Sequence, residues 1–419
     1  MEELGALQAM GFDYGQGFLL AAPMPKSQLI QVLQQRARQA RRIPRPEGAS
    51  VTAVEQCVST LTEFPLRLTH RPGRGAAMMG RLSVTFRRLV GVLPLLTTLL
   101  ASTVQFAAAE RLDGFNVIGM AEHPFGGASA AAALARAKRV GATAVAIVPF
   151  LWQSSASGFD IVRGADMPDE ALRAAIRQAH GAGFAVIVKP HVWVPQSWAG
   201  AVAPTSERDW WAWFAGYRRS IESIGRIAAE EHAEALAIGT ELARTTDRAE
   251  WFDIITTARA AFSGMLTYFA HNSEEAERIP FWARLDVVGV TLYPPLGSDQ
   301  DRAGRIAKMR VVADKLDALA VATGKRIVVG EIGLRSAVGA AAKPWESAEE
   351  RESAPDPLLQ AEVLADWISV LDRPSIHGVL VWRWFTDPDA GGPVDTDFTV
   401  QGKPAEGVLL CAWRLRCGQ

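Results

Sequence analysis

The chain has 419 residues, of which 49% are hydrophobic and 21% are charged, and its formal net charge is −1. This composition predicts a folded protein with a sizeable core rather than a disordered or collagen-like chain. The near-neutral charge, without long runs of one sign, gives no support for a nucleic acid partner. We also infer no obligatory protein partner.

The first segment of interest is "MGFDYGQGFLLAAPMP", within residues 3–35. It resembles the closing segment of EAL-type cyclic di-GMP phosphodiesterase domains, in which a Gly-x-Asp-x-x-Gln-Gly run leads into the last strand of a barrel. The acidic metal ligands of such a domain would lie upstream of residue 1. The resemblance therefore implies a C-terminal remnant over residues 1–38, with no phosphodiesterase activity.

Two further segments precede the regular part of the chain. Residues 39–77 are rich in Arg, Pro and Gly and predict a disordered linker. Residues 78–109 place three arginines before an apolar run at 89–109 that ends in three alanines, which is the layout of a signal peptide or a membrane anchor. We expect the remainder to be periplasmic or secreted, or held at the inner membrane by residues 89–109 if they are not cleaved.

From residue 110 to residue 419, short apolar runs alternate with longer amphipathic ones. Such alternation predicts parallel strands covered by helices. Eight repeats over about 300 residues predict an α/β fold of the (β/α)₈ TIM barrel type. A doubly wound sheet is the alternative, but no Gly-rich phosphate loop follows the first run. The predicted strands are 115–120, 143–150, 184–190, 235–239, 264–270, 285–294, 326–330 and 377–385. The predicted helices are 129–141, 167–183, 206–232, 246–262, 303–324, 357–372 and 402–415.

Two of the predicted strands end alike, in "AIGTE" and "VVGE", which place Glu241 and Glu331 at the ends of the fourth and seventh strands. A buried carboxylate is costly unless it has a partner or a function. In a barrel, chemistry is located at the C-terminal ends of the strands. Two carboxylates about 5–5.5 Å apart are what a retaining glycosidase needs, one as nucleophile and one as acid/base.

Polar and aromatic side chains also follow the other strands, and all 13 tryptophans lie between Trp152 and Trp413. Flat aromatic rings at a site suit the apolar faces of sugars, although many tryptophans serve only packing. We expect these residues to bind the substrate: Trp152, Lys189, His191, Trp193, His271, Asn272, Tyr293, Arg335, Trp382, Trp384 and Asp397.

Six stretches carry a resemblance to clan A glycoside hydrolases and, more narrowly, to glycoside hydrolase family 113, the β-mannanase-type barrels. They are "VKPHVWV", "IGTELART", "GVTLYPPL", "GEIGLRS", "VWRWFTD" and "DTDFTVQGKPAEGVL". The resemblance implies Glu241 as acid/base, Glu331 as nucleophile and a β-1,4-mannan or related β-linked glycan as substrate. The chain departs from the clan at Thr240, where many members have an asparagine that binds the sugar 2-hydroxyl; Asn272 is a candidate for that task.

The two glutamates need no cofactor or metal, and a carbohydrate is the expected partner. A further alternative makes residues 1–77 a signalling module, although we expect their deletion not to affect catalysis. Two other functions for the barrel remain open. One is a glycan-binding barrel without turnover in an exopolysaccharide system. The other is a metal-dependent amidohydrolase or deacetylase using His123, His191 and His271, although the chain has no HxH pair. Cys411 and Cys417 are close enough in sequence to pair in an oxidising compartment.

Overall fold

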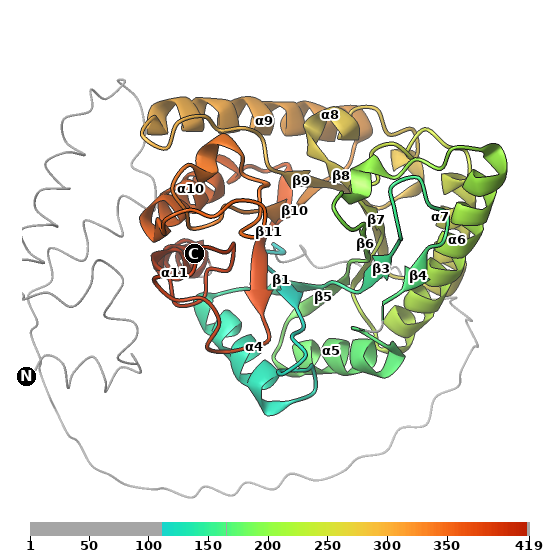
Figure 1. Cartoon of the computed structure of the whole chain (residues 1–419), viewed down its shortest axis with the longest axis horizontal. Helices are drawn as coiled ribbons and strands as arrows, with labels where there is room; N and C mark the ends of the chain where they lie inside the picture. Colours follow the sequence, from blue (N-terminus) through green and yellow to red (C-terminus); the bar gives the residue numbers. More distant parts are fainter. Residues whose placement is uncertain (1–110, 165, 417–419) are drawn as a thin grey trace, which may run out of the picture.

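The computed structural model describes residues 111–164 and 166–416 (Figure 1). These residues form the predicted barrel, and its eight parallel strands close in the order β1-β11-β10-β9-β8-β7-β5-β2. The strands are β1 (Gly114–Ile118), β2 (Ala144–Ile147), β5 (Ala185–Val188), β7 (Ala235–Thr240), β8 (Met265–His271), β9 (Val288–Leu292), β10 (Ile327–Ile332) and β11 (Ile376–Phe385). All eight predicted strands are confirmed.

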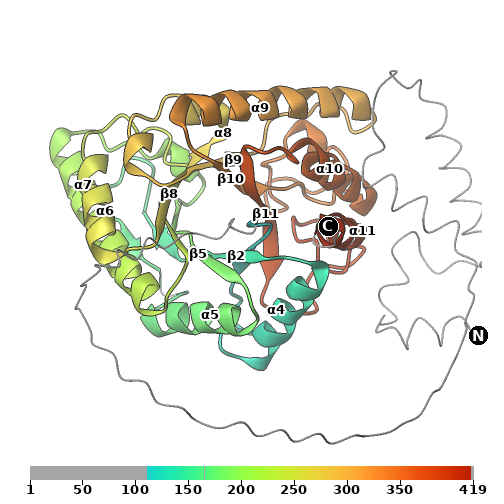
Figure 2. The ribbon, with the colours of Figure 1, turned by 180° about the vertical axis from the view of Figure 1, so that it is seen from behind.

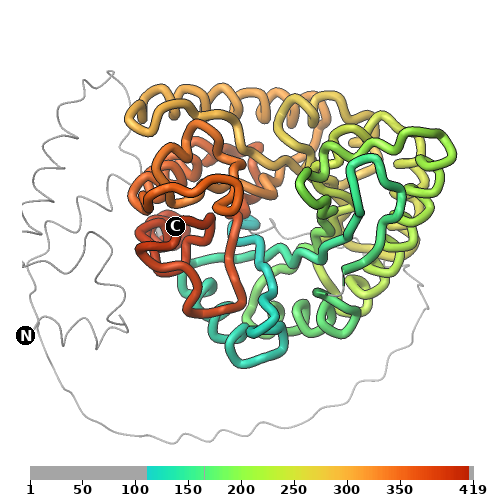
Figure 3. The backbone as a smooth tube through the Cα atoms, viewed as in Figure 1, coloured from blue at the N-terminus to red at the C-terminus, as the bar shows by residue number. Residues whose placement is uncertain are grey.

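Helices surround this ring, as Figure 2 shows from behind. They are α4 (Ala128–Val140), α5 (Asp169–Gly181), α6 (Glu207–Glu230), α7 (Trp251–Ala261), α8 (Asn272–Ala276), α9 (Arg302–Thr323), α10 (Pro357–Val370) and α11 (Pro404–Arg416). The predicted cap is confirmed at α6, where the Ser206 hydroxyl accepts a hydrogen bond from the Asp209 backbone. The last helix, α11, packs against the first, α4, and so closes the outer layer (Figure 3).

Apolar side chains, several of them small, fill the barrel interior beneath the C-terminal ends of the strands. Alanines from β2 and β7 lie there beside Phe269, which is completely buried. A side chain at Gly330 would place its Cβ 2.2 Å from the Phe269 ring, so only glycine fits there. Gly239 is equally confined, since a Cβ would lie 2.8 Å from Trp251. Packing therefore requires glycine at both positions, Gly330 directly before Glu331 and Gly239 two residues before Glu241.

A second sheet extends two of the barrel strands, and the sequence did not predict it. It contains β4 (Val162–Arg163), β3 (Phe150–Trp152) and β6 (His191–Trp193), in that order. The Lys189 backbone N–H donates to the carbonyl of Ile147, and that of His191 donates to Pro149. The pairing of β2 with β5 thus continues beyond the barrel as the pairing of β3 with β6.

The predictions for residues 1–38, 39–77 and 78–109 lie outside the described residues and remain predictions. Within the part of the chain that is described, no helix combines the length and the apolar character needed to cross a membrane. The pairing of Cys411 with Cys417 also remains a prediction, because Cys417 lies outside the described residues.

Candidate active site

Irregular strand ends orient the two glutamates. On β10, Val329 pairs with Val290 and Glu331 with Thr291, so Gly330 is an extra residue without a partner on β9. On β7, two residues lie between Ala237 and Thr240, whereas only one lies between their partners Thr267 and Phe269 on β8. An extra residue of this kind, as in a β-bulge, reverses which face of the strand the following side chains occupy. It can therefore aim a side chain at the barrel mouth.

Glu331 is held from two sides, and its side chain is only 5% exposed. The Lys189 ammonium forms an ion pair with its Oε1. The Tyr293 hydroxyl donates to its Oε2 at 2.9 Å. Burial, and then the charge of Glu331, raise the pKa of Tyr293 well above its usual range, so the phenol remains a donor.

Lys189 is itself fixed below Glu331. Its side chain is completely buried, and its ammonium also donates to Asn116 Oδ1 at 2.9 Å. The Asn116 amide in turn donates to the carbonyl of Gly330 at 2.9 Å. The expected role of Lys189 in contacting sugar is therefore wrong: this lysine supports Glu331 from the interior.

Glu241 has a different set of partners. It directly follows β7 in a left-handed conformation, with φ at 56°, and its backbone N–H donates to the Phe269 carbonyl at 2.8 Å. Its Oε1 accepts from the Thr291 hydroxyl and lies 3.1 Å from His271 Nδ1. Its Oε2 lies 3.7 Å from His191 Nε2. Its side chain is 12% exposed, so it lies at the edge of the solvent.

These neighbours determine where a proton is held. Burial alone raises the pKa of Glu241, but its contacts with the His191 and His271 imidazoles hold that pKa well below its usual range. Burial alone lowers the pKa of His271, but the hydrogen bond and charge of Glu241 raise it above its usual range. The contact therefore favours a proton on the His271 imidazole over one on Glu241, with Nδ1 and Oε1 3.1 Å apart.

Glu275 on α8 is a part of the site that the sequence analysis missed. It is 2% exposed, and it accepts hydrogen bonds from the Tyr268 hydroxyl at 2.9 Å and from the His271 backbone at 2.5 Å. Tyr268 also accepts from the N–H of Leu242, the residue after Glu241. Burial raises the pKa of Glu275 to about 7. An acidic residue four positions after His271, on a short helix that follows β8, was the only signal for it in the sequence.

The predicted role of Trp384 is wrong. On β1, Asn116 pairs with Trp382 and Val117 pairs with Trp384, so Arg383 is an extra residue on β11. This irregularity turns Trp384 outward, where it is completely buried, 4.6 Å from the Phe115 ring, and donates to the Ala133 carbonyl. Trp382 instead is partly exposed, and its ring centroid lies 5.4 Å from the ammonium of Lys189, the ion-pair partner of Glu331.

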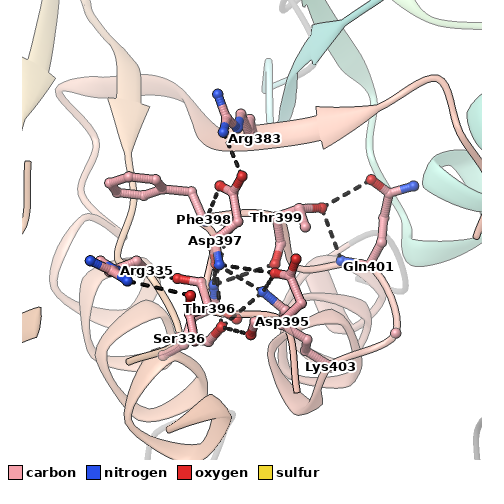
Figure 4. Close-up of polar contacts among 12 residues, drawn as sticks. Arg335, Ser336, Arg383, Asp395, Thr396, Asp397, Phe398, Thr399, Gln401 and Lys403 are labelled. Carbon is pink, nitrogen blue, oxygen red and sulfur yellow. Dashed lines mark hydrogen bonds and ion pairs between the residues drawn. The ribbon is translucent and has the colours of Figure 1, made fainter. Parts of the chain in front are cut away.

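Arg335 was also predicted to bind substrate, and this is wrong because it is completely buried. Its guanidinium donates to the backbone carbonyls of Ser347, Arg351 and Thr396, and so ties together the loops after β10 and β11 (Figure 4). Asp397 belongs to the same group of loops. Its carboxylate pairs with Arg383 (Figure 4), and its side chain is 17% exposed.

The remaining predicted residues lie at or near the mouth. Trp152 and Trp193 are 39% and 49% exposed on the second sheet. Asn272 is partly exposed, but its Oδ1 accepts from the Glu275 backbone at 3.0 Å. Thr240 is buried and donates to the carbonyl of Pro190 at 3.0 Å, so it does not replace the asparagine of other clan members. Among the described residues, no three His, Cys, Asp or Glu side chains lie close enough together to hold a metal ion.

Comparison with known proteins shows which family this barrel belongs to and which solved structures it resembles. The model of glycoside hydrolase family 113 matches residues 117–403. A β-mannanase of that family from Alicyclobacillus acidocaldarius superimposes with a TM-score of 0.65 at 23% identity, over 73% of this chain and 98% of the mannanase. A second β-1,4-mannanase of the family gives a TM-score of 0.63 at 24% identity, over 73% and 99%. A β-glucuronidase from Ruminococcus gnavus gives 0.52 at 15% identity, over 73% and 50%. No match was found among curated proteins.

The fold and the family match together define the class, a glycoside hydrolase built on an eight-stranded barrel. More narrowly, the chain belongs to glycoside hydrolase family 113, and its barrel resembles those of β-mannanases. At these identities, the likeness to the solved structures establishes the fold alone.

Proposed function

We propose that the protein is a retaining glycoside hydrolase that cleaves β-1,4-mannan or a related β-linked glycan. The observation that carries this proposal is the contrast between the surroundings of the two glutamates at the ends of β7 and β10. Glu331 faces a lysine and a phenol, whereas Glu241 faces two histidines and a hydroxyl. Two carboxylates in unlike environments are what separate acid/base and nucleophilic roles require.

In the first step, Glu331 attacks the anomeric carbon and forms a glycosyl ester, while Glu241 takes the proton from His271 and gives it to the leaving oxygen as the glycosidic bond breaks. In the second step, Glu241 takes a proton from water, which attacks the same carbon and releases Glu331. Lys189 and Tyr293 orient Glu331 for attack, because each donates to one of its two oxygens. His271 Nδ1 lies 3.1 Å from Glu241 Oε1, so the imidazole can supply this proton and recover it after the second step.

Separate substitutions Glu241→Gln and Glu331→Gln test these roles, with activated aryl β-mannosides and β-glucosides as substrates. Both variants should lose most turnover, whereas Glu170→Gln, a change at an exposed position on α5, should not. Azide should restore turnover in Glu331→Ala and give a product of inverted anomeric configuration. Parental rates in both glutamine variants would refute the assignment. A loss of activity with a chelator would instead indicate the metal-dependent alternative.

A further inference from the structure

The second sheet has one packed face and one open aromatic face. Trp152 and Trp193 are paired in register on β3 and β6, and their ring centroids lie 5.9 Å apart. Their strand neighbours, Leu151 and Val192, are buried. Because side chains alternate along a strand, both indoles lie on the face opposite the packed one. We call Trp152 and Trp193 the aromatic platform.

The platform is continuous with the active site. From the Trp193 ring, the Phe150 ring is 6.0 Å away, and from Phe150 the His191 ring is 6.2 Å away. His191 Nε2 lies 3.7 Å from Glu241 Oε2. Two residues of a strand span roughly 7 Å. Trp193 thus lies roughly 7 Å further along β6 than His191, in the sheet that extends beyond the barrel strands.

Two further contacts involve the exposed aromatic side chains around the platform. The Trp152 indole N–H donates to Asp166 Oδ1 at 3.1 Å, which holds the edge of that ring. Trp198, 43% exposed, stands with its ring 4.6 Å from His271, the other histidine at Glu241. Exposed aromatic residues therefore extend outward from both histidines of the acid/base. Patches of this kind on a soluble protein are commonly binding sites.

We infer that the aromatic platform is a distal glycan subsite, which binds a sugar beyond those at the scissile bond. An indole face suits the apolar face of a pyranose ring, and a β-1,4-linked chain presents such faces repeatedly. The platform therefore favours oligosaccharides over single-unit glycosides and favours cleavage within a chain. This inference rests on the proposed function, because it takes the scissile bond to lie at Glu241.

Binding without turnover tests the subsite directly. In a Glu241→Gln background, calorimetry measures the affinity for β-1,4-linked hexasaccharides of mannose, glucose and xylose. We expect Trp193→Ala and Trp152→Ala each to weaken binding of the preferred hexasaccharide about tenfold. Trp211→Ala is the matched control, because Trp211 is 71% exposed on α6 and should change the affinity less than about twofold. Trp193→Phe should recover part of the loss, since it keeps an aromatic face.

Kinetics in the otherwise unchanged protein separate the subsite from the reaction. The platform variants should lower kcat/KM for the hexasaccharide about tenfold and leave hydrolysis of an aryl β-mannoside nearly unchanged. Equal affinity in Trp193→Ala and Trp211→Ala, equal losses on both substrates, or no binding of any hexasaccharide would overturn the inference. Weakened binding in a protein that hydrolyses none of the substrates would support the subsite and refute the proposed hydrolase.

Discussion

The ion pair between Lys189 and Glu331 gives a quantitative prediction for the free energy of unfolding. The Lys189 side chain is completely buried and that of Glu331 is 5% exposed, so neither charge has water as an alternative partner. Removing one member of a buried pair leaves the other uncompensated, which typically costs about 3–5 kcal/mol. Lys189→Met keeps an unbranched apolar side chain of similar length but lacks the ammonium. We expect the free energy of unfolding to fall by about that amount.

Urea unfolding followed by circular dichroism measures this loss, and Lys315→Met is the matched control. Lys315 pairs with Glu274, but both side chains are well exposed, 39% and 56%, so its loss should cost less than about 1 kcal/mol. Glu331→Gln should also destabilise, because Lys189 then remains buried without its partner.

The double variant Lys189→Met/Glu331→Gln completes the cycle. It should lose less stability than the sum of the single variants, because no unpaired charge remains in the interior. The reasoning is refuted if Lys189→Met costs no more than Lys315→Met. It is equally refuted if the two single losses add to within about 0.5 kcal/mol.

Three further predictions concern catalysis. Contact with Glu241 raises the pKa of His271 above its usual range, so kcat/KM should fall as pH rises through that raised value. In His271→Asn the alkaline limb of the pH profile should move to lower pH. An unchanged limb would contradict a proton shared between Glu241 and His271. Glu275→Gln replaces one acceptor oxygen with a donor. It should lower kcat for an aryl glycoside roughly tenfold to a hundredfold. A kcat equal to that of the parent would show that Glu275 does not position Glu241. Trp382→Phe should mainly impair turnover and Trp384→Phe should mainly lower stability, as measured by parallel kinetics and urea unfolding. The reverse pattern would contradict the placement of Trp382 at the mouth and Trp384 in the outer core.

The sequence alone was sufficient to predict the barrel, because the patterns that predict each strand and each helix are local. Each strand is a short apolar run, and several of the longer amphipathic runs begin or end at a cap residue or glycine, as at Ser206 before α6 and Gly141 after α4. Eight apolar runs that alternate with seven helical runs have few alternatives to closing into one ring. The placement of Glu241 and Glu331 after strand-ending glycines was equally visible, and the packing at Gly239 and Gly330 explains why glycine stands there.

Only the tertiary structure decided which side chains face the sugar. A period of two places Trp382 and Trp384 on one face of β11, but the extra residue between them puts one at the mouth and the other in the outer core. Lys189 reads in sequence as a strand-end cation open to substrate, yet its partner is 142 positions away. A register irregularity and a long-range ion pair both depend on the neighbouring strand, and the neighbours of a strand are fixed only when the barrel closes.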